Sequence, residues 1–284
     1  GRDVDMQNND GDTALLLAIK RGNESIIRML LRSGAGVNIK NDKGLTPMRA
    51  LFINGYQNYD YSILKMLINR GANLNIKYNK GRTLLYDAID HGKINAVELM
   101  IENGADVNVR DDSGITPFIF AFLDNSRYEI MEKLIDYGAD IKAKDDEGRS
   151  ALSYAAENVD DRDKIDFLLE KGANVNSKDD EGITPLMYAV KENEIKIVRH
   201  LINRGAMLNF SDQRGRSAIF YAVKYREDVV FASILINNGA DVELRTYSGR
   251  TPLMSAVKYN DNTDIIKLLM RNGANPVARD SNGK

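Results

Sequence analysis

The sequence contains no cysteine and no tryptophan, and its 284 residues include two histidines, His91 and His200. Without cysteine the chain can form no disulfide, no thiolate nucleophile and no zinc site built on cysteine. Neither histidine has a serine or carboxylate at the spacing of a known catalytic motif, so we interpret both as ordinary helical residues. Glycine-rich phosphate loops, nucleophile elbows and zinc-binding helices are also missing. We therefore expect no catalysis, no cofactor and no metal.

The chain also has no large excess of either sign of charge and no long apolar run. The 39 Lys and Arg residues nearly balance 41 Asp and Glu residues, which leaves a net charge of -2. Such a chain has no overall attraction for nucleic acid or for an anionic membrane. No apolar run approaches the roughly 18 to 20 residues that a membrane span needs. We expect a folded monomer that binds neither nucleic acid nor the bilayer interior, with the cytoplasm as its default location and export as the alternative.

Two short patterns recur along the whole sequence with one period. The first is Gly-x-Thr or Gly-x-Ser, and it begins at Gly11, Gly44, Gly81, Gly114, Gly148, Gly182, Gly215 and Gly249. The second is Gly-Ala, and it begins at Gly34, Gly71, Gly104, Gly138, Gly172, Gly205, Gly239 and Gly273. Successive markers are 33 to 37 residues apart in both series. Self-similarity at such a period is the signature of a repeat protein.

The unit over 181–213 predicts what each repeat folds into. Thr184 followed by Pro185 is the arrangement of a helix N-cap with proline at the first helical position. The spacing of apolar residues then predicts a short helix that ends near 192–193 and a second helix that closes at Gly205. The polar residues that follow turn the chain back toward the next unit. Each repeat is therefore expected to be a helix, a helix and an extended turn.

The sequence resembles the ankyrin repeat family over nearly its whole length. The motifs that carry the resemblance are Gly-x-Thr-Pro at 44–47, 114–117, 182–185 and 249–252, with Gly-Ala-Asp/Asn-x-Asn at 104–108 and 172–176. The resemblance implies an all-α repeat solenoid of paired antiparallel helices joined by extended β-turn or hairpin loops. The family pattern continues with histidine, whereas this chain has Leu16, Arg49, Tyr86, Ile119, Ser153, Met187, Phe220 and Met254 there. We expect mostly apolar packing to replace that histidine's hydrogen bond.

The markers divide the chain into eight repeats within one expected domain over residues 1–284. The repeats, numbered 1 to 8 below, span approximately 11–43, 44–80, 81–113, 114–147, 148–181, 182–214, 215–248 and 249–282. Residues 1–10 align with the tail of a preceding repeat, and 283–284 begin a ninth. A single unit of this length cannot bury enough surface to fold alone, so neighbours must stabilise each other. This pattern predicts a longer natural array or flanking domains.

Repeat 2 is longer than the others, and its extra residues fall at 54–61, between the two helices. This segment contains three tyrosines and a glycine, a composition that suits a binding loop. The competing interpretation is a tolerated surface insertion, because loop closure costs only about 0.6 kcal/mol per doubling of length.

The position after the family's histidine is aromatic in four consecutive repeats, namely Phe120, Tyr154, Tyr188 and Tyr221. The resemblance implies that this position faces the concave groove, so we expect an exposed aromatic ladder that could supply binding hot spots. The alternative is that these rings pack on neighbouring first helices. Acidic turn tips flank them, at Asp112, Asp146, Glu147, Asp180 and Glu181. Beside these tips lies a row of arginines, each directly after the first glycine of its repeat, namely Arg82, Arg149, Arg216 and Arg250.

These features favour a protein or peptide partner, not yet identified, with apolar anchors and some Lys or Arg, held across repeats 4 to 7. The acidic tips would repel the phosphates of a nucleic acid. Aspartate pairs such as Asp111-Asp112 lack the ligand spacing of a calcium loop and are interpreted as turn-forming residues. Two alternatives stay open: a regulatory or targeting module of a larger enzyme or exported effector, and capture of a small ligand in the groove.

Overall fold

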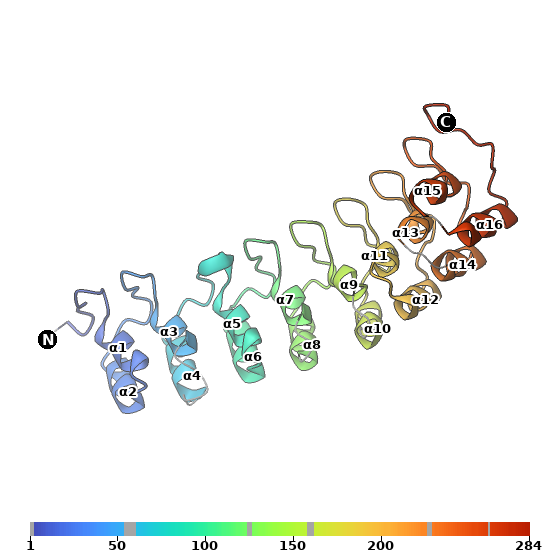
Figure 1. The fold of residues 1–284 in the computed structure, drawn as a ribbon. Helices are drawn as coiled ribbons and strands as arrows, with labels where there is room; N and C mark the ends of the chain where they lie inside the picture. The colour runs from blue at the N-terminus through green and yellow to red at the C-terminus, as the bar shows by residue number, and fades with distance from the viewer. Residues whose placement is uncertain (1–2, 54–60, 124–126, 158–161, 226–228, 261) are drawn as a thin grey trace. The chain divides into compact units, whose positions relative to one another are not determined.

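The computed structural model describes residues 3–53, 61–123, 127–157, 162–225, 229–260 and 262–284. Within these ranges the chain forms sixteen α-helices and one short 3-10 turn, Asn79–Gly81. Extended structure in the described residues is limited to isolated bridges, Gln7 with Thr13 and Lys144 with Ser150. The all-α repeat architecture expected from the sequence is thus confirmed (Figure 1). Most of the tyrosine-rich insertion of repeat 2, residues 54–60, lies outside the described residues.

Backbone contacts divide the chain into two compact units, Gly1–Asp140 and Ile141–Lys284. The helices of the first unit are α1 (Ala14–Lys20), α2 (Glu24–Arg32), α3 (Pro47–Ile53), α4 (Tyr61–Asn69), α5 (Leu84–Asp90), α6 (Ile94–Glu102), α7 (Pro117–Leu123) and α8 (Tyr128–Asp136). Each pair of helices belongs to one of repeats 1 to 4.

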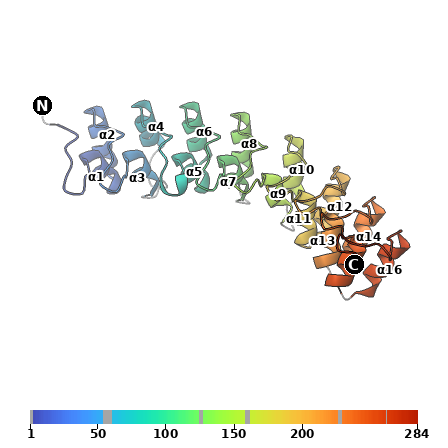
Figure 2. The same cartoon turned by 90° about the horizontal axis from the view of Figure 1, so that it is seen from above.

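The helices of the second unit belong to repeats 5 to 8. They are α9 (Ala151–Ala155), α10 (Arg162–Glu170), α11 (Pro185–Lys191), α12 (Ile195–Asn203), α13 (Ala218–Tyr225), α14 (Val230–Asn237), α15 (Pro252–Tyr259) and α16 (Thr263–Arg271). In both units the first helices of successive repeats pack on one another. The second helices form a parallel row, as Figure 2 shows for each unit.

The helix boundaries predicted in repeat 6 are confirmed. The hydroxyl of Thr184 accepts a hydrogen bond from the N–H of Met187 at 3.4 Å, and Pro185 opens helix α11. The helix is capped at Glu192, and helix α12 then runs over Ile195–Asn203. Gly205 follows with a φ of 91°, the left-handed conformation that glycine adopts without steric cost.

Apolar side chains fill the space between the two rows of helices. Leu186, Val198 and Leu201 are each at most 1% exposed, and the residue equivalent to Leu186 is buried in every other repeat. Removing one such side chain costs roughly 2–5 kcal/mol. A lone helix pair would leave these faces in water, so the stability of each repeat comes from its neighbours.

Where the Gly-Ala motif ends in asparagine, that side chain links its repeat to the next. Asn108 donates its amide to the carbonyl of Gly138 at 3.0 Å, and its side-chain oxygen accepts from the N–H of Asp140 at 2.8 Å. Asn176 makes the same pair of bonds with Gly205 and Met207. One side chain therefore satisfies a donor and an acceptor at the helix end of the following repeat, which explains why the motif ends in asparagine.

The turn before each first helix is called the finger here and is counted with the repeat whose first helix it precedes. Neighbouring fingers of the second unit are stacked on one another. In the second unit, Asp180 N donates to the carbonyl of Glu147 at 3.0 Å, and Gln213 N donates to that of Glu181 at 2.8 Å. This stacking requires glycine at the finger's last position. A Cβ on Gly148, whose φ is 76°, would lie 2.6 Å from the backbone nitrogen of Asp180.

Candidate functional site

Each finger in the second unit is organised by its first residue, an aspartate in repeats 5 to 7. Oδ1 of Asp179 accepts from the N–H groups of Glu181, at 3.0 Å, and Ile183, at 2.7 Å. Asp145 and Asp212 bind the N–H groups two and four residues later in the same way. The aspartates therefore hold the turn, as expected for the aspartate pairs.

The second carboxylate oxygen accepts a hydrogen bond from the tyrosine nine residues later. The hydroxyl groups of Tyr154, Tyr188 and Tyr221 lie 2.6, 2.6 and 2.8 Å from Oδ2 of Asp145, Asp179 and Asp212. Tyr188 is 7% exposed and Tyr221 3% exposed. The prediction of an exposed aromatic ladder is therefore wrong at these two positions, because the ring bridges the finger to its own first helix instead of facing solvent.

These contacts perturb the titration of the groups involved. Burial, followed by the hydrogen bond to Asp179 and that carboxylate's charge, raises the pKa of Tyr188. Burial acts to raise the pKa of Asp212 too, but hydrogen bonds from Arg216 and Tyr221 outweigh it and lower that pKa. The Asp–Tyr pairs are thus neutral-donor, charged-acceptor hydrogen bonds, which are stronger than bonds between neutral groups.

Tyr154 and Phe120 are half-buried, so these two members of the ladder keep some surface toward solvent. In the second unit, the guanidinium of Arg149 lies 4.0 Å from the ring centre of Tyr154 and 4.9 Å from that of Tyr188. In the first unit, Arg82 lies 4.5 Å from the ring centre of Phe120. Each arginine therefore covers an aromatic face by a cation–π contact.

The predicted row of arginines is largely neutralised by local carboxylates. The closest ion pairs are Arg82 with Asp111 at 3.0 Å, Arg149 with Glu157 at 2.5 Å, Arg216 with Asp212 at 2.7 Å and Arg250 with Asp280 at 3.9 Å. Arg149 and Arg216 thus stabilise the fingers and first helices at the positions where the sequence predicted partner contacts.

The acidic residues at the finger tips are exposed. Asp112 lies on the first unit, and Asp146, Glu147, Asp180 and Glu181 lie on two adjacent fingers of the second unit. The hydrogen bond between the backbones of Glu147 and Asp180 places these two fingers side by side. The second unit therefore presents a cluster of four carboxylates, called the acidic tips here.

A family model for ankyrin repeats, built from three copies of the repeat, matches this chain in six overlapping segments, over residues 1–76, 51–145, 85–179, 123–212, 152–246 and 186–280. The chain belongs to the ankyrin repeat family. Ankyrin repeats are in general protein–protein interaction modules and not enzymes.

The family's histidine position shows how this ankyrin chain compensates for the missing ring. Leu16, Ile119 and Met187 are buried apolar residues there, as expected. Tyr86 instead donates its hydroxyl toward the carbonyl of Val109 in its own repeat, at 2.8 Å, and toward that of Ile115 in the next repeat, at 2.6 Å. A polar link between neighbouring ankyrin repeats is therefore retained at this position.

Both histidines of the ankyrin array have structural partners. His200 Nε2 lies 2.9 Å from Asp166 Oδ1, and His91 Nδ1 lies 2.7 Å from the carbonyl of Asp87. Over the described ranges, no three His, Cys, Asp or Glu side chains gather as a metal site requires. None of the helices placed by the structure has the length and apolar character needed to cross a bilayer.

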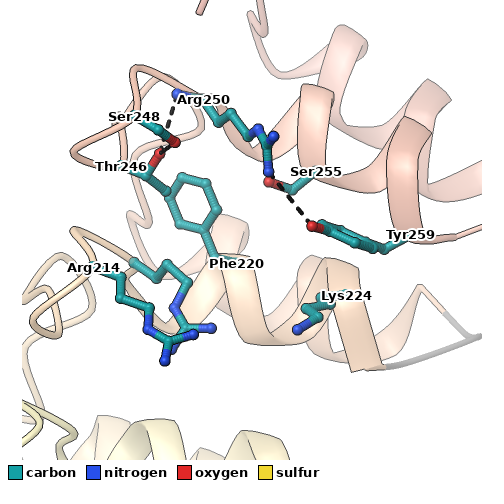
Figure 3. Close-up of a pocket in the computed structure, with 9 residues that line it drawn as sticks. Arg214, Phe220, Lys224, Thr246, Ser248, Arg250, Ser255 and Tyr259 are labelled. Atoms are coloured by element: carbon teal, nitrogen blue, oxygen red, sulfur yellow. Dashed lines mark hydrogen bonds between the residues drawn. The ribbon is translucent and has the colours of Figure 1, made fainter. Parts of the chain in front are cut away.

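One hollow between repeats 7 and 8 of the ankyrin array was not predicted from the sequence. It has a volume of about 190 Å³ and is lined by the cations Arg214, Arg216, Lys224 and Arg250 together with Phe220, Thr246, Ser248, Ser255 and Tyr259. Figure 3 shows the Phe220 ring between Thr246 and the side chain of Arg214. The hollow, called the basic pocket here, lies between two fingers and the helices α13 and α15.

The sequence pattern does not indicate the basic pocket because its residues come from different positions of two repeats. Arg216 and Arg250 belong to the predicted arginine row, but Arg214 is a finger-tip residue and Lys224 lies one turn of helix beyond Phe220. The available signal was the change of finger tips from Asp-Glu in repeats 5 and 6 to Gln-Arg in repeat 7.

Proposed function

We propose that this ankyrin array is a non-catalytic scaffold that binds a protein segment containing Lys or Arg on the acidic tips of the second unit. The observation that carries the proposal is the exposed cluster of Asp146, Glu147, Asp180 and Glu181 on two stacked fingers. The fingers hold these carboxylates on an ordered backbone, so binding a partner does not include the entropic cost of ordering a loop.

The half-exposed ring of Tyr154, beside these fingers, would add an apolar anchor of the kind that dominates interface energetics. Tyr154 and Tyr188 also support the same site indirectly, since they bind the aspartates that shape its two fingers. Asp112 and Phe120 offer the corresponding chemistry on the first unit, where we propose a separate contact of the same type.

A double charge reversal tests the proposal. Glu147→Lys with Glu181→Lys changes two exposed tips whose side chains hold no part of the turn. The matched control is Asp163→Lys with Glu170→Lys, an equal charge change on helix α10. The wild type, the tip variant and the control variant are checked for folding by circular dichroism and then immobilised. The proteins that each of them retains from a lysate of the source cell are quantified by mass spectrometry.

We expect a set of proteins that bind the wild type and the control. The amount of each that is recovered on the tip variant should be at least about tenfold lower, a change of roughly 1.4 kcal/mol in binding free energy. Binding should also weaken with added salt, because exposed charges are screened beyond about 10 Å at 0.1 M ionic strength. Identical sets of proteins on all three baits would refute the role of the acidic tips.

A further inference from the structure

The finger tips of the second unit change sign of charge along the array. Repeats 5 and 6 present the acidic tips, whereas repeat 7 presents Arg214, and its neighbour Arg216 lines the basic pocket. The fingers concerned are stacked in order, since Gln213 N donates to Glu181 and Tyr247 N donates to Arg214. A partner lying along these fingers therefore meets negative charge first and positive charge next.

The basic pocket is lined by several positively charged side chains. Four cations line it, of which Arg216 is paired with Asp212 and Arg250 lies 3.9 Å from Asp280. None of the described residues that line it is a carboxylate. Arg214 is exposed and makes no ion pair with any described residue, so its guanidinium is available to a ligand.

The phenol of Tyr259, which also lines the pocket, is affected by nearby positive charges. A hydrogen bond from Lys258, together with the charges of Lys258 and Arg250, lowers the pKa of Tyr259. Thr246, Ser248 and Ser255 add hydroxyl groups that can donate to an anion, and Phe220 supplies an apolar floor (Figure 3). The hollow thus combines planar guanidinium donors, hydroxyls and an aromatic surface in a volume of about 190 Å³.

We propose that the basic pocket takes the carboxylate of an Asp or Glu side chain of the partner protein. Arginine forks match the planar, two-oxygen geometry of a carboxylate. The inference rests on the proposed function and adds a direction to it: the partner places basic residues on repeats 5 and 6 and acidic residues on repeats 7 and 8. A nucleic acid does not fit this surface, because its uniform negative charge would meet the acidic tips.

Two fluorescein-labelled peptides are the probes, one of alternating Glu and Ala and its counterpart of alternating Lys and Ala. Their binding to the full chain is measured by fluorescence anisotropy at low salt. The test variant is Arg214→Glu, and the matched control is Arg199→Glu on the exposed side of helix α12. Arg214 contributes only backbone groups to the finger, so both variants should remain folded.

We expect the Glu peptide to bind wild type and Arg199→Glu equally and Arg214→Glu at least about tenfold more weakly. Binding of the Lys peptide should not fall in Arg214→Glu. A Glu peptide that binds all three proteins alike, or none of them, overturns the carboxylate site. Displacement of the Glu peptide by inorganic phosphate at concentrations where acetate has no effect also overturns it, since the pocket then selects phosphoryl groups.

The two proposals fail in different ways. The Lys peptide could bind the Glu147→Lys, Glu181→Lys variant as tightly as the wild type while the Glu peptide binds Arg214→Glu more weakly. This result would refute the role of the acidic tips and support that of the basic pocket. The reverse pattern removes only the basic pocket.

Discussion

The hydroxyl of Tyr188 donates to Oδ2 of Asp179 at 2.6 Å, while Oδ1 of the same carboxylate holds two backbone N–H groups of the finger. One aspartate thus couples the turn to the first helix of its repeat. The same relationship recurs between Asp145 and Tyr154 and between Asp212 and Tyr221. Rings that the sequence suggested for partner binding are consequently part of what shapes the fingers.

Removing this hydroxyl should destabilise the protein. Tyr188→Phe keeps the packed ring and leaves one carboxylate oxygen of a buried aspartate without its donor, so we expect a loss of about 1–3 kcal/mol in the free energy of unfolding. Urea denaturation followed by circular dichroism measures it. Tyr247→Phe is the control, since Tyr247 is 76% exposed, and it should change stability by less than about 0.5 kcal/mol. Equal effects would contradict the role of the Asp–Tyr pair.

Stability should fall at alkaline pH. Burial raises the pKa of Tyr86, Tyr154 and Tyr188 above the ordinary value of 10.0. A group whose folded pKa is raised contributes fully below the unfolded pKa, and this contribution is lost as pH rises toward the folded value. The urea midpoint should therefore decrease above about pH 10.

Tyrosinate absorbance provides the direct check on this pH dependence. Tyr259, whose pKa is lowered by Lys258 and Arg250, should ionise before these three do, and the three should form a delayed final phase. Replacing Tyr154 and Tyr188 by Phe should shrink that phase. A single titration near pH 10, with all tyrosines included, would be inconsistent with the burial described.

The asparagine links between repeats should carry measurable free energy. Asn108→Ala removes two hydrogen bonds to the next repeat, at 3.0 and 2.8 Å, and should cost about 1–2 kcal/mol because both lie at the surface. Asn282→Ala, at an exposed position whose side chain makes no bond with the described residues, is the control. Hydrogen exchange at Ala139 and Asp140 should accelerate in Asn108→Ala alone; unchanged exchange there would contradict the link.

Two glycines with similar backbone conformations should respond differently to alanine. Gly148 and Gly172 have φ values of 76° and 98°, so both substitutions incur the left-handed backbone penalty of about 1–2 kcal/mol. A Cβ at Gly148 also meets the next finger, whereas nothing lies within 4 Å of one at Gly172. Gly148→Ala should therefore lower the urea midpoint more, and equal midpoints would show that the fingers separate easily.

The sequence was sufficient for the repeat architecture because its signals are local. The cap at Thr184, the proline after it and the left-handed Gly205 each act within a few residues, and the structure confirms all three. The repeat period then multiplies one local prediction eight times.

Exposure of the ladder could not be predicted in the same way. Helical spacing places Tyr188 and Tyr221 on the finger side of their helices, but the decisive contact is an aspartate nine residues earlier across a turn. The basic pocket depends on side chains from two repeats, so neither repeat taken alone contains it. Exposure of the acidic tips could be predicted from the sequence, since the side chains at the second and third finger positions have no role in closing the turn.

The asparagine bridges have a mechanical consequence. Each joins one repeat to the next within its unit, and in the second unit Asn176 and Asn209 serve two successive junctions. Tension applied along a unit would therefore be borne by one junction after another, and we expect extension under force to release the chain in steps of single repeats.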